Sequence, residues 1–156
     1  MRRMILSTIL ISGALLQGCK ATAPGAAQTA AMTRAKHWLF IGNRKTQNPT
    51  AYSAKSMAEG KEAFTHYCVA CHGLDGQNTG VPFADKMDPP VPSLATRDVQ
   101  SYTDGQLKWV IDNGIAPSGM PASKGVLSDD EQWAIVVFLR HLPPAGSLGE
   151  PPIYGN

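Results

Sequence analysis

Apolar positions recur at helical spacing in three stretches of the chain after residue 53. In the first stretch, Met57, Gly60 and Phe64 fall on one helix face, and in the last a wide apolar arc begins at Trp133. The remaining stretch lies between them, after Thr103. Gly60 has no side chain, so it would let two helix backbones approach closely. The pattern predicts three helices, with the first and the last in contact.

The three predicted helices share one start signal, a hydroxyl residue followed three positions later by Glu or Gln. Such a pair forms a capping box, in which each partner satisfies a backbone N–H at the start of the helix. The pairs are Ser56 with Glu59, Thr103 with Gln106, and Ser128 with Glu131. They predict helices over residues 56 to about 66, 103–113 and 128–141. A left-handed Gly114 would end the second helix, and a pair of prolines follows the third.

The stretch between the first and second predicted helices has a different composition. Residues 73–99 are rich in Gly, Pro, Asp and Asn and show no strand alternation, which predicts an ordered loop. With 15 Gly and 12 Pro in 156 residues, much of the chain should be loop. The three helices offer limited apolar area to one another. A large apolar ligand in the core would supply the buried apolar area that the three helices lack for a stable fold.

The N-terminal residues predict an export signal. Arg2 and Arg3 precede an apolar run at residues 4–16, which is shorter than the roughly 20 residues of a membrane-spanning helix. The run ends in L-Q-G-C at residues 16–19, which resembles the bacterial lipobox. Residues 1–18 would then be a lipoprotein signal peptide, and Cys19 would become the lipidated N-terminus. The alternative is an ordinary signal cleaved after A-T-A at residues 21–23, which would discard Cys19.

The charge balance of the chain limits the classes of partner that it could bind. The chain has 14 Lys and Arg against 12 Asp and Glu, and a net charge of +2 is too small to suggest a nucleic-acid partner. Removing Arg2 and Arg3 leaves 12 basic against 12 acidic residues, so charge-driven membrane binding is not expected. Acyl chains on Cys19 would be the only anchor, at ~0.8 kcal/mol per buried CH₂.

Residues 19–52 form an N-terminal extension between the signal and the helices. Residues 20–32 are rich in Ala, Thr, Gly and Gln and cannot bury enough apolar surface to become ordered, which predicts a tether. An apolar patch with Trp38 and Phe40 follows at residues 37–41. We expect this patch to contact the domain, because an exposed Trp and Phe would be a liability. A contact with a partner protein is the alternative.

The decisive chemical motif is C-x-x-C-H at residues 68–72, directly after the first predicted helix. Cys68 and Cys71 can each form a thioether with a haem vinyl group, and His72 is then held beneath the iron as a ligand. A thioredoxin-type thiol pair would need a βαβ context that the sequence lacks, and half of a zinc site would need a second Cys/His pair. With Cys68 and Cys71 assigned to haem and Cys19 to lipid, no disulfide is predicted.

The second iron ligand must come from another part of the chain, and we predict Met120. It lies 48 residues after His72 in a turn-rich loop whose glycines permit a close approach to a flat ring. Met87, in the proline-rich stretch, is the competing candidate. Three other residues are set aside, because Met57 belongs to a helix face, Met32 to the tether, and His66 lies too near the motif to reach the opposite side of the haem.

Residues 56–142 resemble a class I cytochrome c. The resemblance rests on Gly60 and Phe64 in the first helix, the C-x-x-C-H motif, the proline-rich residues 89–94, Asn113-Gly114 ahead of Met120-Pro121, and Trp133 and Phe138 in the last helix. It implies an all-α fold of three to four helices around one covalent haem c, here with an extended N-terminal tether. It also implies that Gly60 and Phe64 cross Ile135 and Phe138, and that a backbone carbonyl of residues 89–92 accepts a hydrogen bond from His72 Nδ1–H.

A haem with His72 and Met120 as axial ligands has no open coordination position, so it transfers electrons. We therefore expect a monohaem one-electron carrier, with a donor and an acceptor redox protein, that is not itself an enzyme. The cytochrome domain would span residues 53–142, with a Pro- and Gly-rich tail at 143–156, and would face the periplasm at the bacterial cell envelope. Two alternatives are a haem-bearing subunit of a larger membrane oxidoreductase complex and a haem enzyme or gas sensor with a labile Met120.

Overall fold

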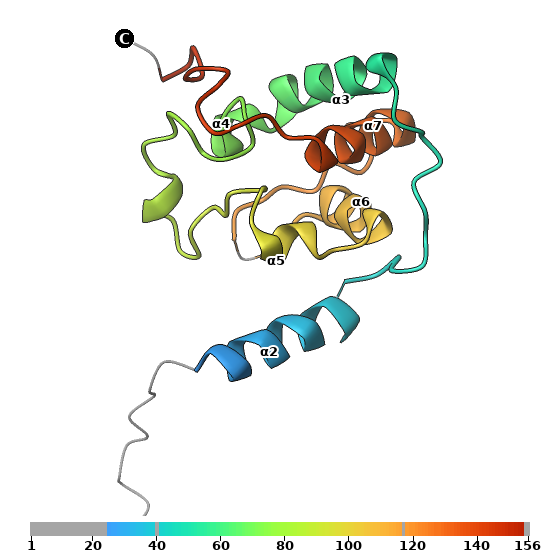
Figure 1. Cartoon of the computed structure of the whole chain (residues 1–156), viewed down its shortest axis with the longest axis vertical. Helices are drawn as coiled ribbons and strands as arrows, with labels where there is room; N and C mark the ends of the chain where they lie inside the picture. The colour runs from blue at the N-terminus through green and yellow to red at the C-terminus, as the bar shows by residue number, and fades with distance from the viewer. Residues whose placement is uncertain (1–24, 40, 117, 155–156) are drawn as a thin grey trace, which may run out of the picture. The chain divides into compact units, whose positions relative to one another are not determined.

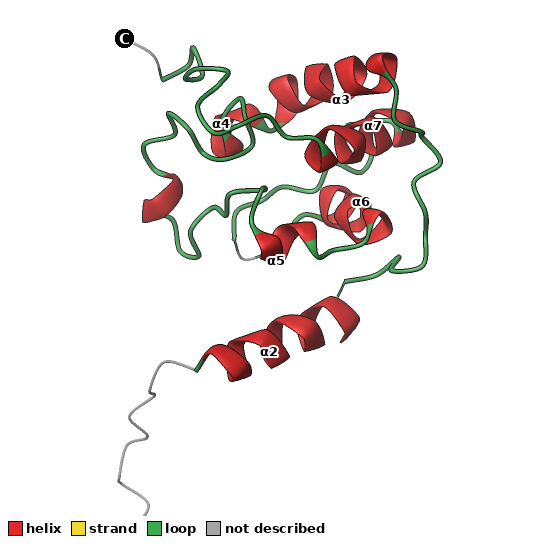
Figure 2. Ribbon diagram, in the orientation of Figure 1, coloured by secondary structure: helices red, strands yellow, loops and turns green. Residues whose placement is uncertain are grey.

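The computed structural model describes residues 25–39, 41–116 and 118–154. Within these residues the regular elements are all helices, joined by loops (Figure 2). Extended pairing is limited there to two isolated bridges. The chain divides into two units with the boundary after Met32. The second unit holds the predicted helices, so the expected all-α architecture is confirmed for the part of the chain that is described.

Long loops join most of the helices, including those between α4 and α5 and between α6 and α7 (Figure 1). In order, the described elements are α2 (Ala26–Leu39), α3 (Ala54–Tyr67), α4 (Val69–His72), the 3₁₀ turn η2 (Ala84–Lys86), α5 (Arg97–Gln100), α6 (Asp104–Asn113) and α7 (Asp129–Arg140). The last helix, α7, lies beside both α3 and α6. It is therefore the centre of the domain.

Two of the three predicted capping boxes are confirmed, and the third is wrong by one turn. Thr103 with Gln106 opens α6, and Ser128 with Glu131 opens α7. The first predicted helix, α3, is capped instead by Ser53, whose hydroxyl accepts from Ser56 N–H at 3.0 Å while Ser53 N–H donates to the Ser56 hydroxyl at 2.9 Å. A serine at the third helical position thus does what Glu or Gln usually does, which is why the start signal was placed too late.

The crossing of α3 and α7 forms the centre of the core. Phe64 and Phe138 are 1% and 2% exposed, and their ring centroids lie 5.1 Å apart. A Cβ on Gly60 would lie 2.0 Å from the Ala134 carbonyl oxygen, so the two backbones touch where the sequence predicted a close approach. Phe138 is part of the crossing, as expected. The backbone facing Gly60 belongs to Ala134 rather than to the predicted Ile135.

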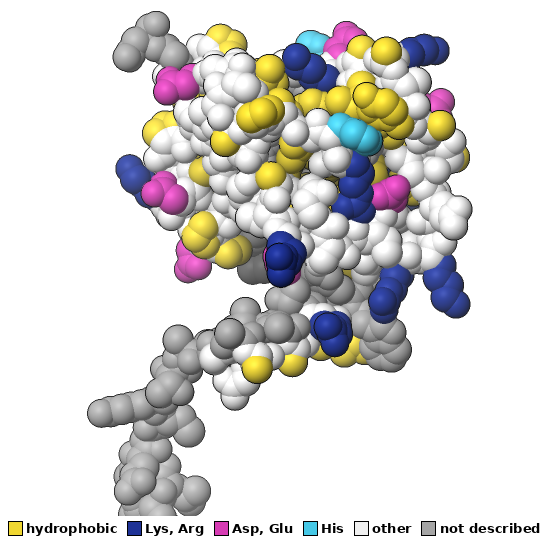
Figure 3. All heavy atoms as spheres, in the orientation of Figure 1, with side chains coloured by type: hydrophobic (Ala, Val, Ile, Leu, Met, Phe, Trp, Pro, Cys, Tyr) yellow, Lys and Arg dark blue, Asp and Glu magenta, His cyan; other side chains and the backbone are white. Residues whose placement is uncertain are grey.

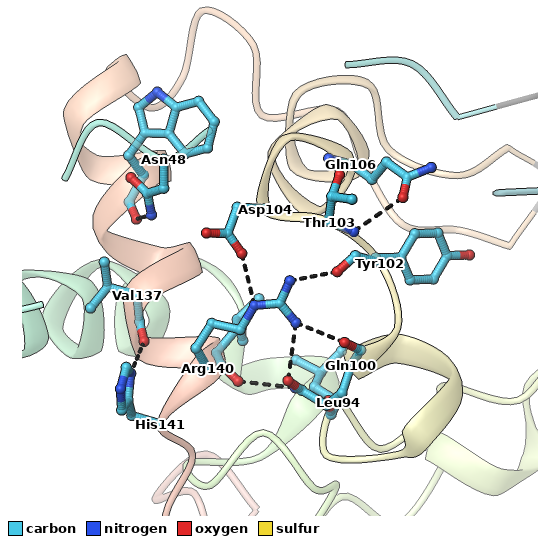
Figure 4. Close-up of polar contacts among 12 residues, drawn as sticks. Asn48, Leu94, Gln100, Tyr102, Thr103, Asp104, Gln106, Val137, Arg140 and His141 are labelled. Atoms are coloured by element: carbon cyan, nitrogen blue, oxygen red, sulfur yellow. Dashed lines mark hydrogen bonds and ion pairs between the residues drawn. The ribbon is translucent and has the colours of Figure 1, made fainter. Parts of the chain in front are cut away.

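Charged side chains connect α6 to α7 at both ends of the contact. The Lys108 ammonium lies 2.9 Å from Asp112 and 2.8 Å from Asp129, and 5.6 Å from the ring centre of Trp133. At the other end, the Arg140 guanidinium donates to Asp104 at 2.8 Å and to the backbone carbonyls of residues 100 and 102 (Figure 4). These contacts hold the start of α6 against the end of α7.

The N-terminal extension differs from the expected tether, because residues 26–39 form the helix α2. Alanine is the strongest helix former, so an alanine-rich segment can be helical without burying much apolar surface. Of the apolar patch at residues 37–41, Ile41 contacts the core cluster, whereas the side chains of Trp38 and Phe40 lie outside the described residues. None of the described helices is long and apolar enough to cross a membrane.

Candidate functional site

The attachment turn, residues 68–72, begins where α3 ends. Cys68 N–H donates to the Phe64 carbonyl at 2.8 Å and closes α3, while the N–H groups of Cys71 and His72 donate to the Cys68 carbonyl at 3.2 and 3.0 Å. Both cysteines are half-buried and carry free thiols. Gly73 follows with a φ of 70°, and a Cβ there would lie 2.8 Å from loop backbone. The turn therefore places two thiols and an imidazole within five consecutive residues.

The protonation of the thiols separates the haem interpretation from a redox-active thiol pair. Burial, and after it the neighbouring Cys71, raises the pKa of the Cys68 thiol to about 12. Thiol–disulfide exchange requires the thiolate and hence a lowered pKa. Cys68 therefore stays protonated at neutral pH, which does not suit the first thiol of a thioredoxin-type pair. Among the described residues, no group of three or more His, Cys, Asp and Glu side chains could hold a metal ion.

The His72 imidazole is mostly buried. Its ring centroid lies 6.4 Å from that of Phe64. Burial lowers the pKa of His72 to about 4, against the opposing effect of the Pro92 backbone carbonyl. Nδ1 is buried and makes no hydrogen bond of normal geometry, although the Pro92 carbonyl is near enough to favour the protonated ring. The imidazole is therefore neutral at physiological pH, which is the form that binds a metal.

The loop after the attachment turn is ordered, as predicted, and it folds back onto that turn. Asn78 N–H donates to the His72 carbonyl at 2.8 Å, and Asn78 Nδ2 donates to the Val91 carbonyl at 2.7 Å. Leu94 N–H donates to the Gly76 carbonyl at 2.8 Å. Sequence reasoning missed Asn78. The available signal was an Asn within a Gly-rich stretch, because Asn tolerates positive φ, and its φ here is 63°.

The two candidate methionines lie in one region of the domain. Met120 is half-buried in the loop between α6 and α7, and its carbonyl accepts from Ile115 N–H at 3.2 Å. A Cβ on Gly114 would lie 2.4 Å from the Met120 carbonyl oxygen, so the turn that ends α6 requires glycine. A Cβ on Gly119 would lie 3.4 Å from the Met87 methyl group. Met87 therefore approaches the residue that precedes Met120.

The C-terminal segment, residues 143–154, covers the attachment turn and the start of its loop. Tyr154 donates its hydroxyl to the Ala70 carbonyl at 2.9 Å, inside the C-x-x-C-H motif, and Gly146 N–H donates to Asp75 at 2.7 Å. Asp75 is completely buried. No local pattern in the sequence indicated that the tail would contact the motif.

Apolar side chains also gather over α3 and α7 on the face seen in Figure 3.

The attachment turn fits a covalent haem, because its two thiols can form thioethers and its neutral imidazole can bind iron. A helical domain built around such a turn defines the class of c-type cytochromes. Residues 55–139, more than half of the chain, match the family model of cytochrome c oxidase, cbb3-type, subunit III, and the chain belongs to this family. Membership implies covalently bound haem c and a role in electron transfer. No curated protein matches the chain.

Proposed function

We propose that this protein is a monohaem c-type cytochrome that carries one electron at a time between a donor and an acceptor protein. The attachment turn is the observation that carries the proposal, because Cys68, Cys71 and the mostly buried, neutral His72 share one helical turn. The motif occurs once in the chain, which supports a single haem. In this proposal Cys68 and Cys71 form the thioethers and His72 is the proximal ligand.

Met120 is the distal ligand in this proposal. Its support is its half-buried position in the loop after α6, which begins at Gly114 and has Gly119 directly before Met120, both glycines with positive φ. A thioether sulfur favours Fe(II) over Fe(III) and so raises the reduction potential relative to a second imidazole. Two protein ligands leave the iron without an open position, so we propose electron transfer rather than catalysis at the haem.

The chain's own contribution is to hold the haem and to exclude water from it. Haem c, when bound, supplies the one-electron couple. Phe64 places an apolar ring beside His72 and is itself covered by Phe138. The attachment turn is tied on both sides, to α3 through the Cys68 N–H and to the C-terminal segment through the Ala70 carbonyl. A rigid, dry setting keeps the reorganisation on electron transfer small.

A haem-bearing subunit of a larger membrane oxidoreductase complex is the second candidate function. The observation that favours it is the family match, since that family is named for subunit III of a cytochrome c oxidase. Solubilisation of native membranes in mild detergent, followed by haem staining of a native gel, distinguishes a complex subunit from a free electron carrier. A haem band that migrates with other subunits supports the complex, and a band at the size of the single chain supports a free carrier.

Cys19 is the membrane anchor in this proposal, which places the domain on the periplasmic side of the bacterial cell envelope. Cys19 lies outside the described residues, and the support is the L-Q-G-C sequence at residues 16–19. Cys19→Ala should block lipoprotein processing, and mass spectrometry of the wild-type N-terminus should show acyl chains. A processed Cys19→Ala chain that partitions into detergent without acyl mass would contradict the lipid anchor.

The distal ligand is tested by substitution at the two candidate methionines. Met120→His should keep the iron six-coordinate and lower the reduction potential, because imidazole donates more strongly to Fe(III) than a thioether does. Met120→Ala should open the iron to CO or cyanide. Met87→Ala is the matched control and should keep the near-infrared sulfur-to-iron charge-transfer band of the oxidised protein. Loss of that band in Met87→Ala, with its survival in Met120→Ala, would assign the ligand to Met87 instead.

Haem attachment is tested at the cysteines. Cys68→Ala and Cys71→Ala should each leave at most one thioether, and the chain should be largely unfolded because the haem supplies part of the core. Cys19→Ala is the matched control, since it removes a cysteine outside the motif and should keep full haem content. Haem content is measured by the pyridine haemochrome spectrum. A folded, haem-free Cys68→Ala protein would show that the haem does not organise the domain.

A further inference from the structure

Asn78 lies between the attachment turn and the proline-rich loop and is hydrogen-bonded to both. Its backbone N–H donates to the His72 carbonyl at 2.8 Å, and its side-chain Nδ2 donates to the Val91 carbonyl at 2.7 Å. Its Oδ1 is buried and has no hydrogen-bond partner among the described residues. The donor half of the amide therefore makes the connection, while the acceptor half is left unsatisfied at a cost.

The bond from Asn78 completes the restraint on Val91. Val91 N–H donates to the Ala84 carbonyl at 2.8 Å, so both backbone polar groups of this residue are held. Pro92 comes next, and its ring restricts its own φ to about −65°. The direction of the Pro92 carbonyl consequently depends on how Val91 is held.

The Pro92 carbonyl is the neighbour of the buried His72 Nδ1. It lies near enough to favour the protonated ring, although Nδ1 makes no hydrogen bond of normal geometry to any described residue. An acceptor fixed at this nitrogen sets the ring orientation of a metal-binding imidazole and increases its electron donation to the metal. Asn78 thus reaches His72 by two routes, directly through the His72 backbone and indirectly through Val91 and Pro92.

We propose that Asn78 is a positioning residue for the proximal ligand, holding the Pro92 carbonyl against His72 Nδ1 and so setting the electron donation of the imidazole to the haem iron. The inference rests on the proposed role of His72 as the iron ligand. Without the Asn78 amide, the Val91–Pro92 segment loses the side-chain bond that ties it to the attachment turn, and the Pro92 carbonyl can move away from the ring. The imidazole then donates less to Fe(III), and the reduction potential rises.

Asn78→Gly in the haem-loaded protein is the sharpest test. Glycine accepts the left-handed φ of 63° and keeps the backbone N–H that bonds His72, so only the side-chain amide is lost. Asn43→Gly is the matched control, because Asn43 is the other non-glycine residue with positive φ (59°) among those described and is exposed. Two quantities are measured, the reduction potential and the solvent exchange rate of the His72 Nδ1 proton by NMR of the reduced protein.

We expect Asn78→Gly to shift the one-electron equilibrium toward Fe(II) by up to about tenfold, which is 59 mV, and to exchange the Nδ1 proton about tenfold faster. Asn43→Gly should change neither quantity. A potential and an exchange rate equal to those of Asn43→Gly would overturn the role of Asn78, even if the variant is less stable. If the wild type shows no Nδ1 proton signal of an iron-bound histidine at His72, the assignment of His72 as the iron ligand in the proposed function is refuted instead.

A second variant, Asn78→Asp, keeps the proposal testable if the Asn78→Gly protein accumulates poorly. Asn78→Asp tolerates the left-handed φ and has nearly the same shape, but its carboxylate donates no hydrogen bond to Val91. Its charge would itself alter the potential, so the comparison uses the Nδ1 exchange rate alone. Faster exchange than in the wild type supports the positioning role, and an unchanged rate overturns it.

Discussion

Gly60→Ala should destabilise the protein although alanine is the better helix former. The new Cβ would lie 2.0 Å from the Ala134 carbonyl oxygen, 2.6 Å from its carbonyl carbon and 3.1 Å from the Phe138 Cβ. Even a close carbon–oxygen contact needs about 3.3 Å, so α3 and α7 would have to separate by roughly 1 Å. Two of the three atoms are backbone, which no rotamer change can move.

The size of the effect follows from two opposing terms. Overpacking a core costs about 1–3 kcal/mol, and the rigid obstacle places this site at the upper end. The gain in helix propensity from glycine to alanine returns about 1 kcal/mol. We therefore expect the free energy of unfolding to fall by about 2 kcal/mol, which corresponds to a drop in Tm of roughly 8–16 °C for a domain of this size.

Guanidinium unfolding of the haem-loaded protein, followed by circular dichroism, measures this change. Lys61→Ala is the control, because Lys61 is the exposed neighbour on the same helix and its loss should change stability by less than about 0.5 kcal/mol. A Gly60→Ala protein as stable as the wild type would show that the crossing of α3 and α7 is not the tight backbone contact described above.

Three further changes test other contacts. Burial raises the pKa of Asp75, but hydrogen bonds led by that from the Gly146 N–H outweigh it, so its net pKa is lowered. The stabilisation by the ionised Asp75 should be present above the unfolded-state pKa and lost as the pH falls through the folded-state pKa. Asp75→Asn should lower the free energy of unfolding by about 1–3 kcal/mol at pH 7. In urea unfolding measured at a series of pH values, the variant should lose less stability in acid than the wild type. Tyr154→Phe should speed hydrogen exchange in the attachment turn, measured by mass spectrometry, with haem content unchanged. Lys108→Met should lower the thermal unfolding midpoint more than Asp129→Ala, because Asp129 is 80% exposed.

The main elements of the fold could be predicted because their signals are local. The boxes of Thr103 with Gln106 and of Ser128 with Glu131 join residues three positions apart, so the chain needs no other segment to form them. The C-x-x-C-H motif is equally local, since one helical turn brings Cys68, Cys71 and His72 together. The error at the first helix was local as well, because Ser53 with Ser56 is a rarer form of the same box.

The support around the attachment turn was decided only by the tertiary structure. Tyr154 meets Ala70 across 84 residues, and Gly146 meets Asp75 across 71. Such contacts depend on the path of the whole chain, and a tyrosine or a buried aspartate has no sequence spacing that identifies its partner. Asn78 shows the same division, because its positive φ is a local property that Asn tolerates, whereas its bond to Val91 exists only once the proline-rich loop has folded back.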